Sequence, residues 1–418
     1  MRRCTACLIL KFKIAIISLL ASSSLVAQPS NQSFGLTTLG GQDGNVIKVT
    51  NLNNEGIGSL RWAVSQPGKR IVVFEVGGVI NLAKNNIVIS EPFITIAGQT
   101  APEPGITLIR GGIKVITNDV IIKHLMIRPG DNNEKKRSGW ETDGIAVSGR
   151  SAFNVHIDHC SLTWAIDENL SASGPRDKGH EATSHDIAFT NNIIAEALDN
   201  STHIKGRHSK GLLVHDYVRN VAVINNLFAH NDRRNPYFKG HTTGVVVNNL
   251  LYDIGNAAVQ LGYIEEEYAH TNLTPVNPKV AVVGNRLIYG NSSYSDLALA
   301  AYQGDVYMHD NQVVNLRGGL MPISQGAVIK LSEPPLWPKG LVAFPQVELE
   351  QRILQQVGAR PWQRDPIDQR IVNSVITKTG QLIDSQEDVG GYPHYVATYR
   401  PITVPRSDIV NWLKSFEP

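Results

Sequence analysis

The chain contains few cysteines and no large excess of one charge. Its 418 residues include three cysteines, Cys4, Cys7 and Cys160, and the first two lie in an N-terminal segment that we expect to be removed. A mature chain with Cys160 alone cannot form an intramolecular disulfide, so a hydrophobic core must provide its stability. Lys and Arg number 39 and Asp and Glu 37, which leaves a formal charge of +2 and no molecule-wide field for nucleic acid. We therefore expect no nucleic-acid partner, and any basic site must be local.

Nucleotide-binding glycine patterns and interdomain linkers are absent as well. Neither the Rossmann nor the P-loop spacing of glycines occurs in the sequence. No Ser/Thr/Pro-rich stretch and no break in composition marks a separate carbohydrate-binding domain. We therefore expect residues 28–418 to form one domain, with a C-terminal flank from about 331 to 418.

The longest apolar run lies at the N-terminus. The segment has four basic residues, then an apolar run, then a small residue: Arg2, Arg3, Lys11, Lys13, Ile14–Val26 and Ala27. This order is typical of a secretory signal peptide, so residues 1–27 predict export with cleavage near Ala27. The run is short and rich in serine for a membrane anchor, although an uncleaved anchor is the alternative. We expect a secreted protein, extracellular or periplasmic, without stable membrane insertion.

Short β-branched runs that end in asparagine are abundant. The sixth position of each of six such runs holds Cys160, Asn192, Asn226, Asn249, Asn285 and Asn311. The spacing between successive positions is 23 to 36 residues, which is typical of a solenoid, and short strands with few helical patterns between them favour a parallel β-helix. A bend at the same place in every coil would stack the asparagines into a ladder, in which each side-chain amide bonds to the next coil.

Helical patterns occur mainly at the two ends of the chain. Ser59–Ser65 has helical spacing and predicts an N-terminal cap over the first coil, since an uncapped β-helix exposes apolar residues and unpaired strand edges. Three further helices are predicted at residues 347–357, 365–377 and 408–416. The apolar, proline-rich segment 331–345 is expected to pack along the flank of the solenoid.

Five ordered motifs resemble those of bacterial pectate lyases of polysaccharide lyase family 1. They lie at residues 99–108, 127–131, 157–164, 167–171 and 230–236, and the resemblance extends over nearly the whole mature chain. It implies an all-β protein, a single-stranded right-handed parallel β-helix, that cleaves de-esterified polygalacturonate by β-elimination with Ca²⁺ between enzyme and substrate. We expect a monomer whose partner is this acidic plant cell-wall polysaccharide.

The reaction implied by the resemblance needs three kinds of group. A weakly acidic proton α to a carboxylate must be removed, so the site must neutralise that carboxylate and stabilise the developing negative charge. Ca²⁺ with oxygen ligands suits the first task and Lys or Arg the second. A base must also accept the proton.

The resemblance places the base at Arg234, in the sequence Arg234-Asn235-Pro236. Guanidinium normally stays protonated, and a desolvated cationic cluster would ease the transfer. The neighbouring Arg233 is a candidate for substrate binding, with a side chain expected to point the other way on an extended backbone. Solvent-facing ion pairs with nearby acids are the alternative for both arginines.

Three lysines are candidates for binding substrate carboxylates. Where the family usually has a second arginine, five residues beyond the base, this chain has Lys239, which keeps the charge but loses bidentate recognition. A lysine one coil earlier is also implied by the resemblance, and both Lys205 and Lys210 are available. Lys210, followed by Gly-Leu-Leu, is the better match.

The resemblance assigns calcium to acids on consecutive coils. Asp143 fits the first position, and Glu141, two residues earlier, would share its face and could assist if the segment is a strand. Asp167 and Glu168 are the acids available on the next coil, whereas Asn169 falls where another acid would be expected. Turn capping by Asp167 or Glu168 is the alternative.

Other polar residues and other functions are alternatives to this assignment. Asp158 and His159 are interpreted as a structural polar contact, and Cys160 as a small buried residue. The nearest enzymatic alternative is a pectin lyase acting on methyl-esterified polymer, which would need fewer acids and more aromatic surface. A hydrolytic β-helix enzyme would need paired aspartates, yet no Asp-Asp dipeptide occurs. A non-catalytic polysaccharide-binding solenoid is the alternative outside enzymes.

Overall fold

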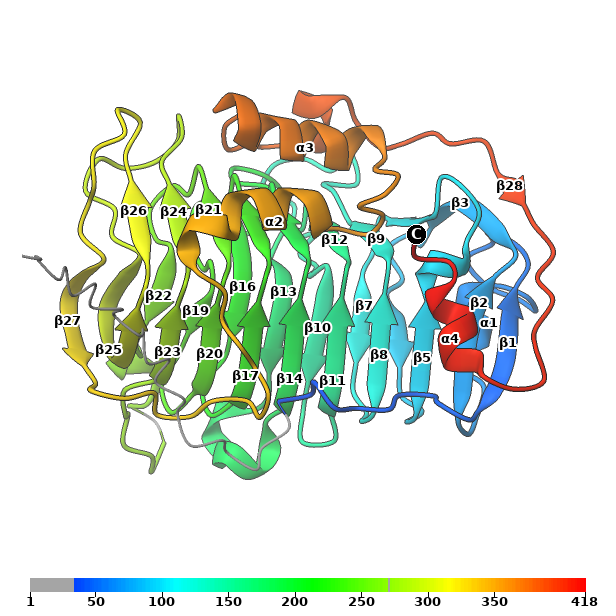
Figure 1. The fold of residues 1–418 in the computed structure, drawn as a ribbon, viewed down its shortest axis with the longest axis horizontal. Coiled ribbons are helices and arrows are strands. Elements are labelled where there is room, and N and C mark those ends of the chain that lie inside the picture. The colour runs from blue at the N-terminus through cyan, green and yellow to red at the C-terminus, as the bar shows by residue number, and fades with distance from the viewer. Residues whose placement is uncertain (1–33, 270) are drawn as a thin grey trace, which may run out of the picture.

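The computed structural model describes residues 34–269 and 271–418 and shows one long stack of parallel strands (Figure 1). Three short strands and three turns make up a typical coil, and successive coils stack along the axis of the solenoid. The fold is a right-handed parallel β-helix, as predicted. The predicted signal peptide lies outside the described residues. Within the described part of the chain, no helix has the length and apolar character needed to span a membrane.

Three parallel sheets extend along the solenoid. Sheet I consists of β4 (Ile87–Ile89), β7 (Ile113–Val115), β10 (Ile145–Ser148), β13 (Glu168–Ser173), β16 (Lys210–Val214), β19 (Tyr237–Phe238), β22 (Val259–Leu261), β25 (Ala300–His309) and β27 (Ser324–Lys330). Sheet II consists of β1 (Asn45–Val49), β2 (Arg70–Phe74), β5 (Ile94–Ala97), β8 (Val120–Lys123), β11 (Phe153–Asp158), β14 (His185–Thr190), β17 (Arg219–Ile224), β20 (Thr243–Val247) and β23 (Lys279–Val283). The long strand β25 pairs with both β22 and β23 and so joins these two sheets.

Sheet III forms the remaining side. It consists of β3 (Val76–Asn81), β6 (Ile106–Ile109), β9 (Leu125–Arg128), β12 (Ser161–Thr163), β15 (Ile193–Ala195), β18 (Leu227–Ala229), β21 (Leu250–Tyr252), β24 (Arg286–Ile288) and β26 (Gln312–Val314). The side chains that point inward from the three sheets form the central core, with Val, Ile and Leu stacked over one another from coil to coil.

The predicted asparagine ladder is present at the bend between sheets II and III. The side-chain amide of Asn192 donates to Oδ1 of Asn226 at 3.0 Å, and Asn226 donates in turn to Asn249 at 2.9 Å. The same bond continues through Asn285 to Asn311, and the backbone N–H of Cys160 begins the series by donating to Asn192. The residues that precede these six positions are His159, Asn191, Asn225, Asn248, Gly284 and Asp310, and all have a positive φ. A left-handed residue therefore makes each bend, and from Asn192 to Asn311 the asparagine after it donates to a backbone carbonyl of the preceding coil.

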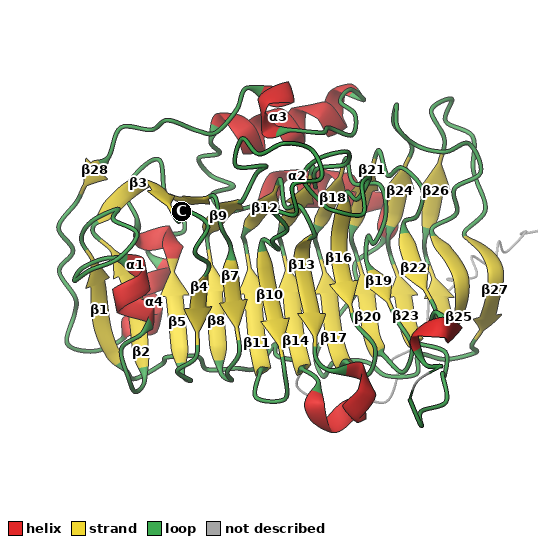
Figure 2. Ribbon diagram, turned by 180° about the vertical axis from the view of Figure 1, so that it is seen from behind, coloured by secondary structure: helices red, strands yellow, loops and turns green. Residues whose placement is uncertain are grey.

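Helices lie at the ends and along the flanks, as the sequence predicts (Figure 2). Helix α1 (Leu60–Val64) packs against β1 and β4 at the N-terminal end, with Ser59 as its N-cap. Helices α2 (Leu349–Gln356) and α3 (Pro366–Thr377) cover the outer face of sheet III, and α4 (Ile409–Lys414) returns to the N-terminal part of sheet II. Just before α4, β28 (Thr398–Tyr399) pairs antiparallel with β3.

The segment after β27 also covers the solenoid. Leu336, Trp337 and Leu341 pack against alanines and valines on the outer face of sheet II, as expected for the flank. Hydrophobic clusters therefore cover outer faces of sheets II and III. Among the described residues no such cluster lies on the outer face of sheet I, which leaves that face available for a polar site.

Two smaller predictions concern the ladder region. Cys160 is fully buried, has no disulfide partner among the described residues, and burial raises the pKa of its thiol to about 12. Asp158 lies 3.0 Å from Nδ1 of His159 and accepts hydrogen bonds from Thr190 and Asn191 on the next coil. Asp158 and His159 thus make the structural polar contact that was predicted.

Candidate active site

Charged side chains gather where four neighbouring strands of sheet I begin. Asp143 lies two residues before β10, Glu168 is the first residue of β13 and Lys210 is the first residue of β16. Arg233 forms a parallel bridge with Lys210 just before β19, and Arg234 follows it. Parallel register stacks the beginnings of these strands, so residues far apart in sequence lie on adjacent coils.

Three carboxylates form the acidic half of this site. One oxygen each from Asp143, Asp167 and Glu168 lie within 4.8 Å of one another. The backbone N–H of Glu168 donates to Oδ1 of Asp143 at 3.2 Å, and the hydroxyl of Ser171 donates to Oδ2. The structure thus brings together all three acids that the sequence assigned to the metal.

The pKa values of two of these acids are shifted in opposite directions. Burial, together with the nearby charge of Asp167, raises the pKa of Asp143 to about 7. Burial acts on Asp167 in the same direction, but a hydrogen bond from His208 and the charge of Arg234 outweigh it and hold the pKa of Asp167 below its usual value. The raised pKa of Asp143 therefore comes first from burial and next from the carboxylate of Asp167 beside it.

The carboxylate cluster fits a hard divalent cation. Ligand oxygens lie roughly 2.3–2.6 Å from Ca²⁺, so two ligands of one ion are at most roughly 5 Å apart, and the separations in this cluster, all within 4.8 Å, satisfy that limit. The described donors in this cluster are all oxygens, which hard cations prefer.

Arg234 joins the acidic and cationic halves of the site. Its Nη1 contacts Oε1 of Glu168, and its guanidinium lies 5.9 Å from the centre of the Tyr237 ring. Burial lowers the pKa of Arg234, although the charges of Asp167 and Asp143 act in the opposite direction. The φ of Arg234 is 63°, so the expectation of an extended backbone that separates the side chains of Arg233 and Arg234 was wrong.

Lys210 is a buried lysine whose ammonium group has no acid in direct contact among the described residues. Its residue is 6% exposed, and among the described residues no hydrogen bond or ion pair satisfies its ammonium group. Burial, and next the charge of Arg233, lower its pKa to about 8. Arg233 is more exposed and donates from Nε to Asp232 at 2.9 Å. Both cations therefore have donors available for an anionic ligand.

The other two lysines are placed differently. Lys239, directly after β19, is 4% exposed, and its Nζ contacts Glu267 and lies 3.1 Å from Oδ2 of Asp216. Arg176 binds the same two acids, so the charge of Lys239 is already paired in this structure. Lys205 lies on an exposed turn beyond the acids. The substrate-binding roles of both lysines stay predictions.

Glu141 and Asn169 take structural roles. The carboxylate of Glu141 accepts the backbone N–H of Ile204 at 2.8 Å and does not belong to the acid cluster. Asn169 is fully buried, accepts the N–H of Ala165 and donates to the carbonyl of Ala195. The amide of Asn169 thus satisfies backbone groups inside the solenoid.

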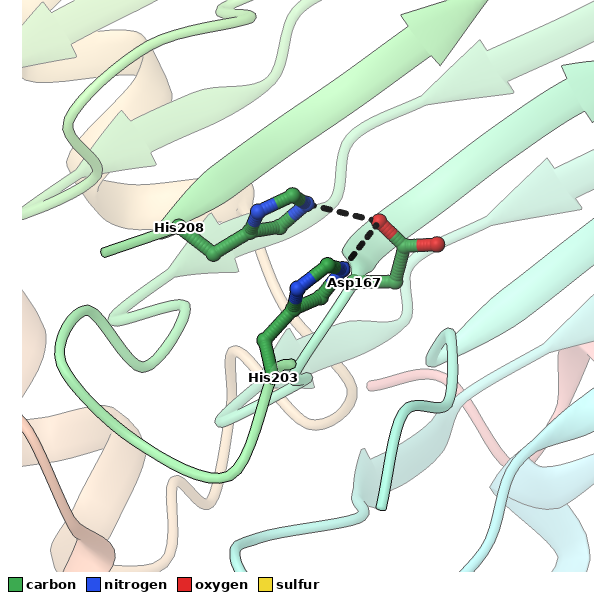
Figure 3. Close-up of side chains that lie close together, drawn as sticks. All are labelled: Asp167, His203 and His208. Carbon is green, nitrogen blue, oxygen red and sulfur yellow. Dashed lines mark hydrogen bonds and ion pairs between the residues drawn. The ribbon is translucent and has the colours of Figure 1, made fainter. Parts of the chain in front are cut away.

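A pair of stacked histidines beside Asp167 was missed by sequence reasoning. The rings of His203 and His208 are stacked with centroids 3.7 Å apart, and Nε2 of His208 lies 2.8 Å from Oδ1 of Asp167 (Figure 3). Burial, and next His208, lower the pKa of His203. The only signal in the sequence was two histidines five residues apart, in a segment that drew attention for its lysines.

The fold and this site define a right-handed parallel β-helix protein with carboxylates and cations combined on sheet I. The probable pectate lyase C of Aspergillus flavus is 33% identical over 391 residues, which cover 90% of this chain and 84% of that protein. The probable pectate lyase C of Emericella nidulans is 31% identical over 377 residues, with 89% and 81% covered. No protein-family model matches the chain. The chain belongs to the pectate lyase family, and the protein is a polysaccharide lyase.

Solved structures support the same fold. The major cedar pollen allergen has a TM-score of 0.58 and 18% identity, covering 78% of this chain and 92% of that one. A pectate lyase bound to a hexasaccharide has a TM-score of 0.50 and 13% identity, covering 81% and 99%. At these identities the likeness is one of fold.

Proposed function

We propose that this pectate lyase cleaves de-esterified polygalacturonate by calcium-assisted β-elimination and releases unsaturated oligogalacturonides. The observation that carries the proposal is the acid cluster where the strands of sheet I begin. Arg234 contacts one of its carboxylates, and Lys210 lies on the adjoining coil. An acidic cluster alone would repel a polyuronate. A cation held there, together with buried basic side chains, would attract it.

The residues divide into metal ligands and substrate ligands. Asp143, Asp167 and Glu168 would hold Ca²⁺, which when bound supplies positive charge to neutralise the uronate carboxylate. Lys210 and Arg233 bind the carboxylates of the polymer, since both have donors that no acid of the described site fully occupies. Lys205 and Lys239 are proposed as further contacts to the same polysaccharide, with Lys239 paired to Asp216 and Glu267 in this structure.

Arg234 accepts the proton in this account. It removes the ring proton α to the uronate carboxylate, and the electron pair left behind forms the new double bond. The glycosidic oxygen leaves with its bonding pair and takes up a proton from water. Burial lowers the pKa of Arg234 and so increases the fraction of its neutral form, although guanidinium remains a weak base. The contact with Glu168 orients the guanidinium toward the head of sheet I.

The setting of the enzyme is part of the proposal. The signal-peptide pattern in residues 1–27 supports secretion of a mature chain that begins near Gln28. Residues 28–418 then act as one domain and as a monomer.

The test is ultraviolet absorbance of unsaturated uronide ends while the purified protein acts on polygalacturonate, with calcium or with chelator. We expect absorbance to rise only with calcium and to be lost in Arg234→Ala, while the exposed control Arg317→Ala behaves as wild type. Absorbance that rises only on methyl-esterified pectin would assign a pectin lyase. Binding of both polymers without any rise would contradict the enzyme assignment and favour a binding solenoid.

A further inference from the structure

The stacked histidines beside Asp167 have no part in the reaction proposed above. Nε2 of His208 lies 2.8 Å from Oδ1 of Asp167, and Nε2 of His203 lies 3.8 Å from the same oxygen. Figure 3 shows both rings on one side of the carboxylate with a nitrogen of each directed toward it. The three ligand atoms lie within 4.8 Å of one another.

These distances suit a borderline transition-metal ion. Zinc binds imidazole nitrogen and carboxylate oxygen at roughly 2.0–2.1 Å with tetrahedral geometry, so two of its ligand atoms are roughly 3.3 Å apart. The two observed separations, 2.8 and 3.8 Å, lie on either side of that value. The planes of the two stacked rings are 12° apart, so the rings must tilt out of the stack before the lone pairs of both nitrogens can point at one ion.

The surroundings support two imidazole ligands. The side chains of His203 and His208 are 3% and 8% exposed, whereas that of Asp167 is 38% exposed and leaves a side open for water as a further ligand. The backbone N–H of Lys205 donates to Nδ1 of His203, which places the proton of the neutral ring on Nε2. Nε2 binds a cation only in the other tautomer, so the hydrogen bond from Lys205 must break first, and the proton on Nδ1 then faces Oε1 of Glu141 at 3.5 Å.

We propose that Asp167, His203 and His208 form a second cation site, selective for borderline transition-metal ions such as Zn²⁺. The site differs in chemistry from the oxygen-only cluster of Asp143, Asp167 and Glu168, because imidazole favours transition metals and carboxylate oxygen favours calcium. The two sites share Asp167.

Sharing one carboxylate makes the two sites compete. An ion bound between the histidines draws on the charge of Asp167 and repels a second divalent ion nearby, so zinc weakens calcium binding. Coupling between binding sites is reciprocal, so calcium weakens zinc to the same degree. This coupling rests on the proposed calcium site, whereas zinc binding itself does not.

Binding is tested on the full chain without calcium, by calorimetric titration with Zn²⁺ and by visible absorption on titration with Co²⁺. We expect one equivalent to bind in wild type and this equivalent to be lost in His203→Ala and in His208→Gln, which keeps a donor for Asp167 but removes the imidazole. The exposed control His309→Ala should bind as wild type does. Equal uptake by all variants, or no uptake by wild type, would overturn the proposal.

Coupling is tested by titrating Ca²⁺ with and without one equivalent of Zn²⁺. We expect zinc to weaken calcium binding by about 5-fold or more in wild type and to have no effect in His208→Gln. An equal effect in both proteins would overturn the shared-ligand account. If calcium does not bind and polygalacturonate is not cleaved, the proposed function fails, while the zinc titration still reports on the histidine site.

Discussion

Burial where the strands of sheet I begin shifts the pKa values of two side chains that take part in the proposed reaction. Asp143 has a pKa of about 7, above its usual value, and Lys210 has a pKa of about 8, below its usual value. In both cases the buried charge is incompletely paired within the protein. A bound ligand of opposite charge should therefore stabilise the ionised form of each group. A cation would stabilise the ionised acid, and a uronate carboxylate would stabilise the charged lysine.

Asp143→Asn should weaken calcium binding and leave the metal-free fold as stable as wild type or more stable. The folded pKa of Asp143 is raised, so its contribution to stability is present below its unfolded pKa and is lost as pH rises through about 7. At pH 8 the ionised side chain therefore destabilises the metal-free protein, and asparagine removes that effect. Calorimetric calcium titration and denaturant unfolding in chelator measure the two changes. Unaltered calcium affinity would exclude Asp143 as a ligand.

The binding of polygalacturonate should weaken as pH rises through about 8. Lys210 loses its proton in that range because its pKa is lowered by burial and by Arg233. In Lys210→Arg the charge persists, so KM should stay nearly constant over the same range. Measuring KM from pH 7 to 9 in both proteins tests this. A parallel rise of KM in the arginine variant would assign the titration to another group.

At the residue scale, sequence motifs named acids and an arginine that the structure brings together, but they did not predict the environment of every cation. The acids and Arg234 lie at strand beginnings, which parallel register brings together. The pairing of Lys239 joins Asp216 of the preceding coil and Glu267 of the following coil, and no local pattern indicates it. The contact between His208 and Asp167 likewise joins residues 41 positions apart.

At the scale of elements, the asparagine ladder is a stabilising device that can be tested by position. Asn226 is fully buried, accepts the N–H of Asn192 and donates to the carbonyl of Phe189 and to Asn249. Asn226→Ala leaves buried backbone groups without partners and should lower the free energy of unfolding by about 3 kcal/mol.

The end of the ladder provides the matched control. Asn311 is partly exposed, so water can replace part of what its side chain bonds, and Asn311→Ala should lower the free energy of unfolding by about 1 kcal/mol. Denaturant unfolding of both variants measures the difference. Equal losses at the two positions would show that burial within the ladder does not decide its contribution.

Glu417, which follows the C-terminal helix α4, binds the chain end to the solenoid through its carboxylate. Glu417 lies 3.1 Å from Nζ of Lys123 and 3.2 Å from Nε2 of His124. Burial would raise its pKa, but the bond to His124 and the charge of Lys123 outweigh burial and lower the pKa from 4.5 to about 2. The carboxylate of Glu417 thus stabilises the folded state above pH 4.5.

Replacing this acid should give a pH-dependent loss of stability. Because the folded pKa is lowered, the contribution of Glu417 is present above its unfolded pKa and is lost as pH falls from 4.5 through about 2. Glu417→Gln should lower the free energy of unfolding at pH 7 by less than about 1 kcal/mol, since the site is partly exposed and screened by solvent. Thermal unfolding of the two proteins should converge at low pH, and a constant difference would contradict this role.

Local patterns predicted the elements better than their long-range partners. The asparagines at strand ends are local signals, and so are Ser59 and Asp365, which cap helices. The sequence accordingly predicted both the ladder and the helices. The return of the chain after β27 to pair β28 with β3 joins distant parts of the sequence. Such contacts arise from packing of the whole solenoid and leave no periodic signal.

At the scale of the whole molecule, the covered faces explain where the site lies. The C-terminal chain packs on sheets II and III, while the outer face of sheet I holds the acids and cations at its strand beginnings. A polymer that lies across several coils can therefore meet several charged side chains at once. This arrangement supports action on a long acidic polysaccharide.

The most direct test of the account is mass spectrometry of the products from polygalacturonate, formed with calcium in water enriched in oxygen-18. β-Elimination breaks the glycosidic bond without adding water, so the account predicts unsaturated fragments that are lighter by one water than hydrolytic fragments and acquire no label through bond cleavage. Saturated fragments that contain oxygen-18 from cleavage would show hydrolysis and contradict the roles assigned to Arg234 and the acid cluster.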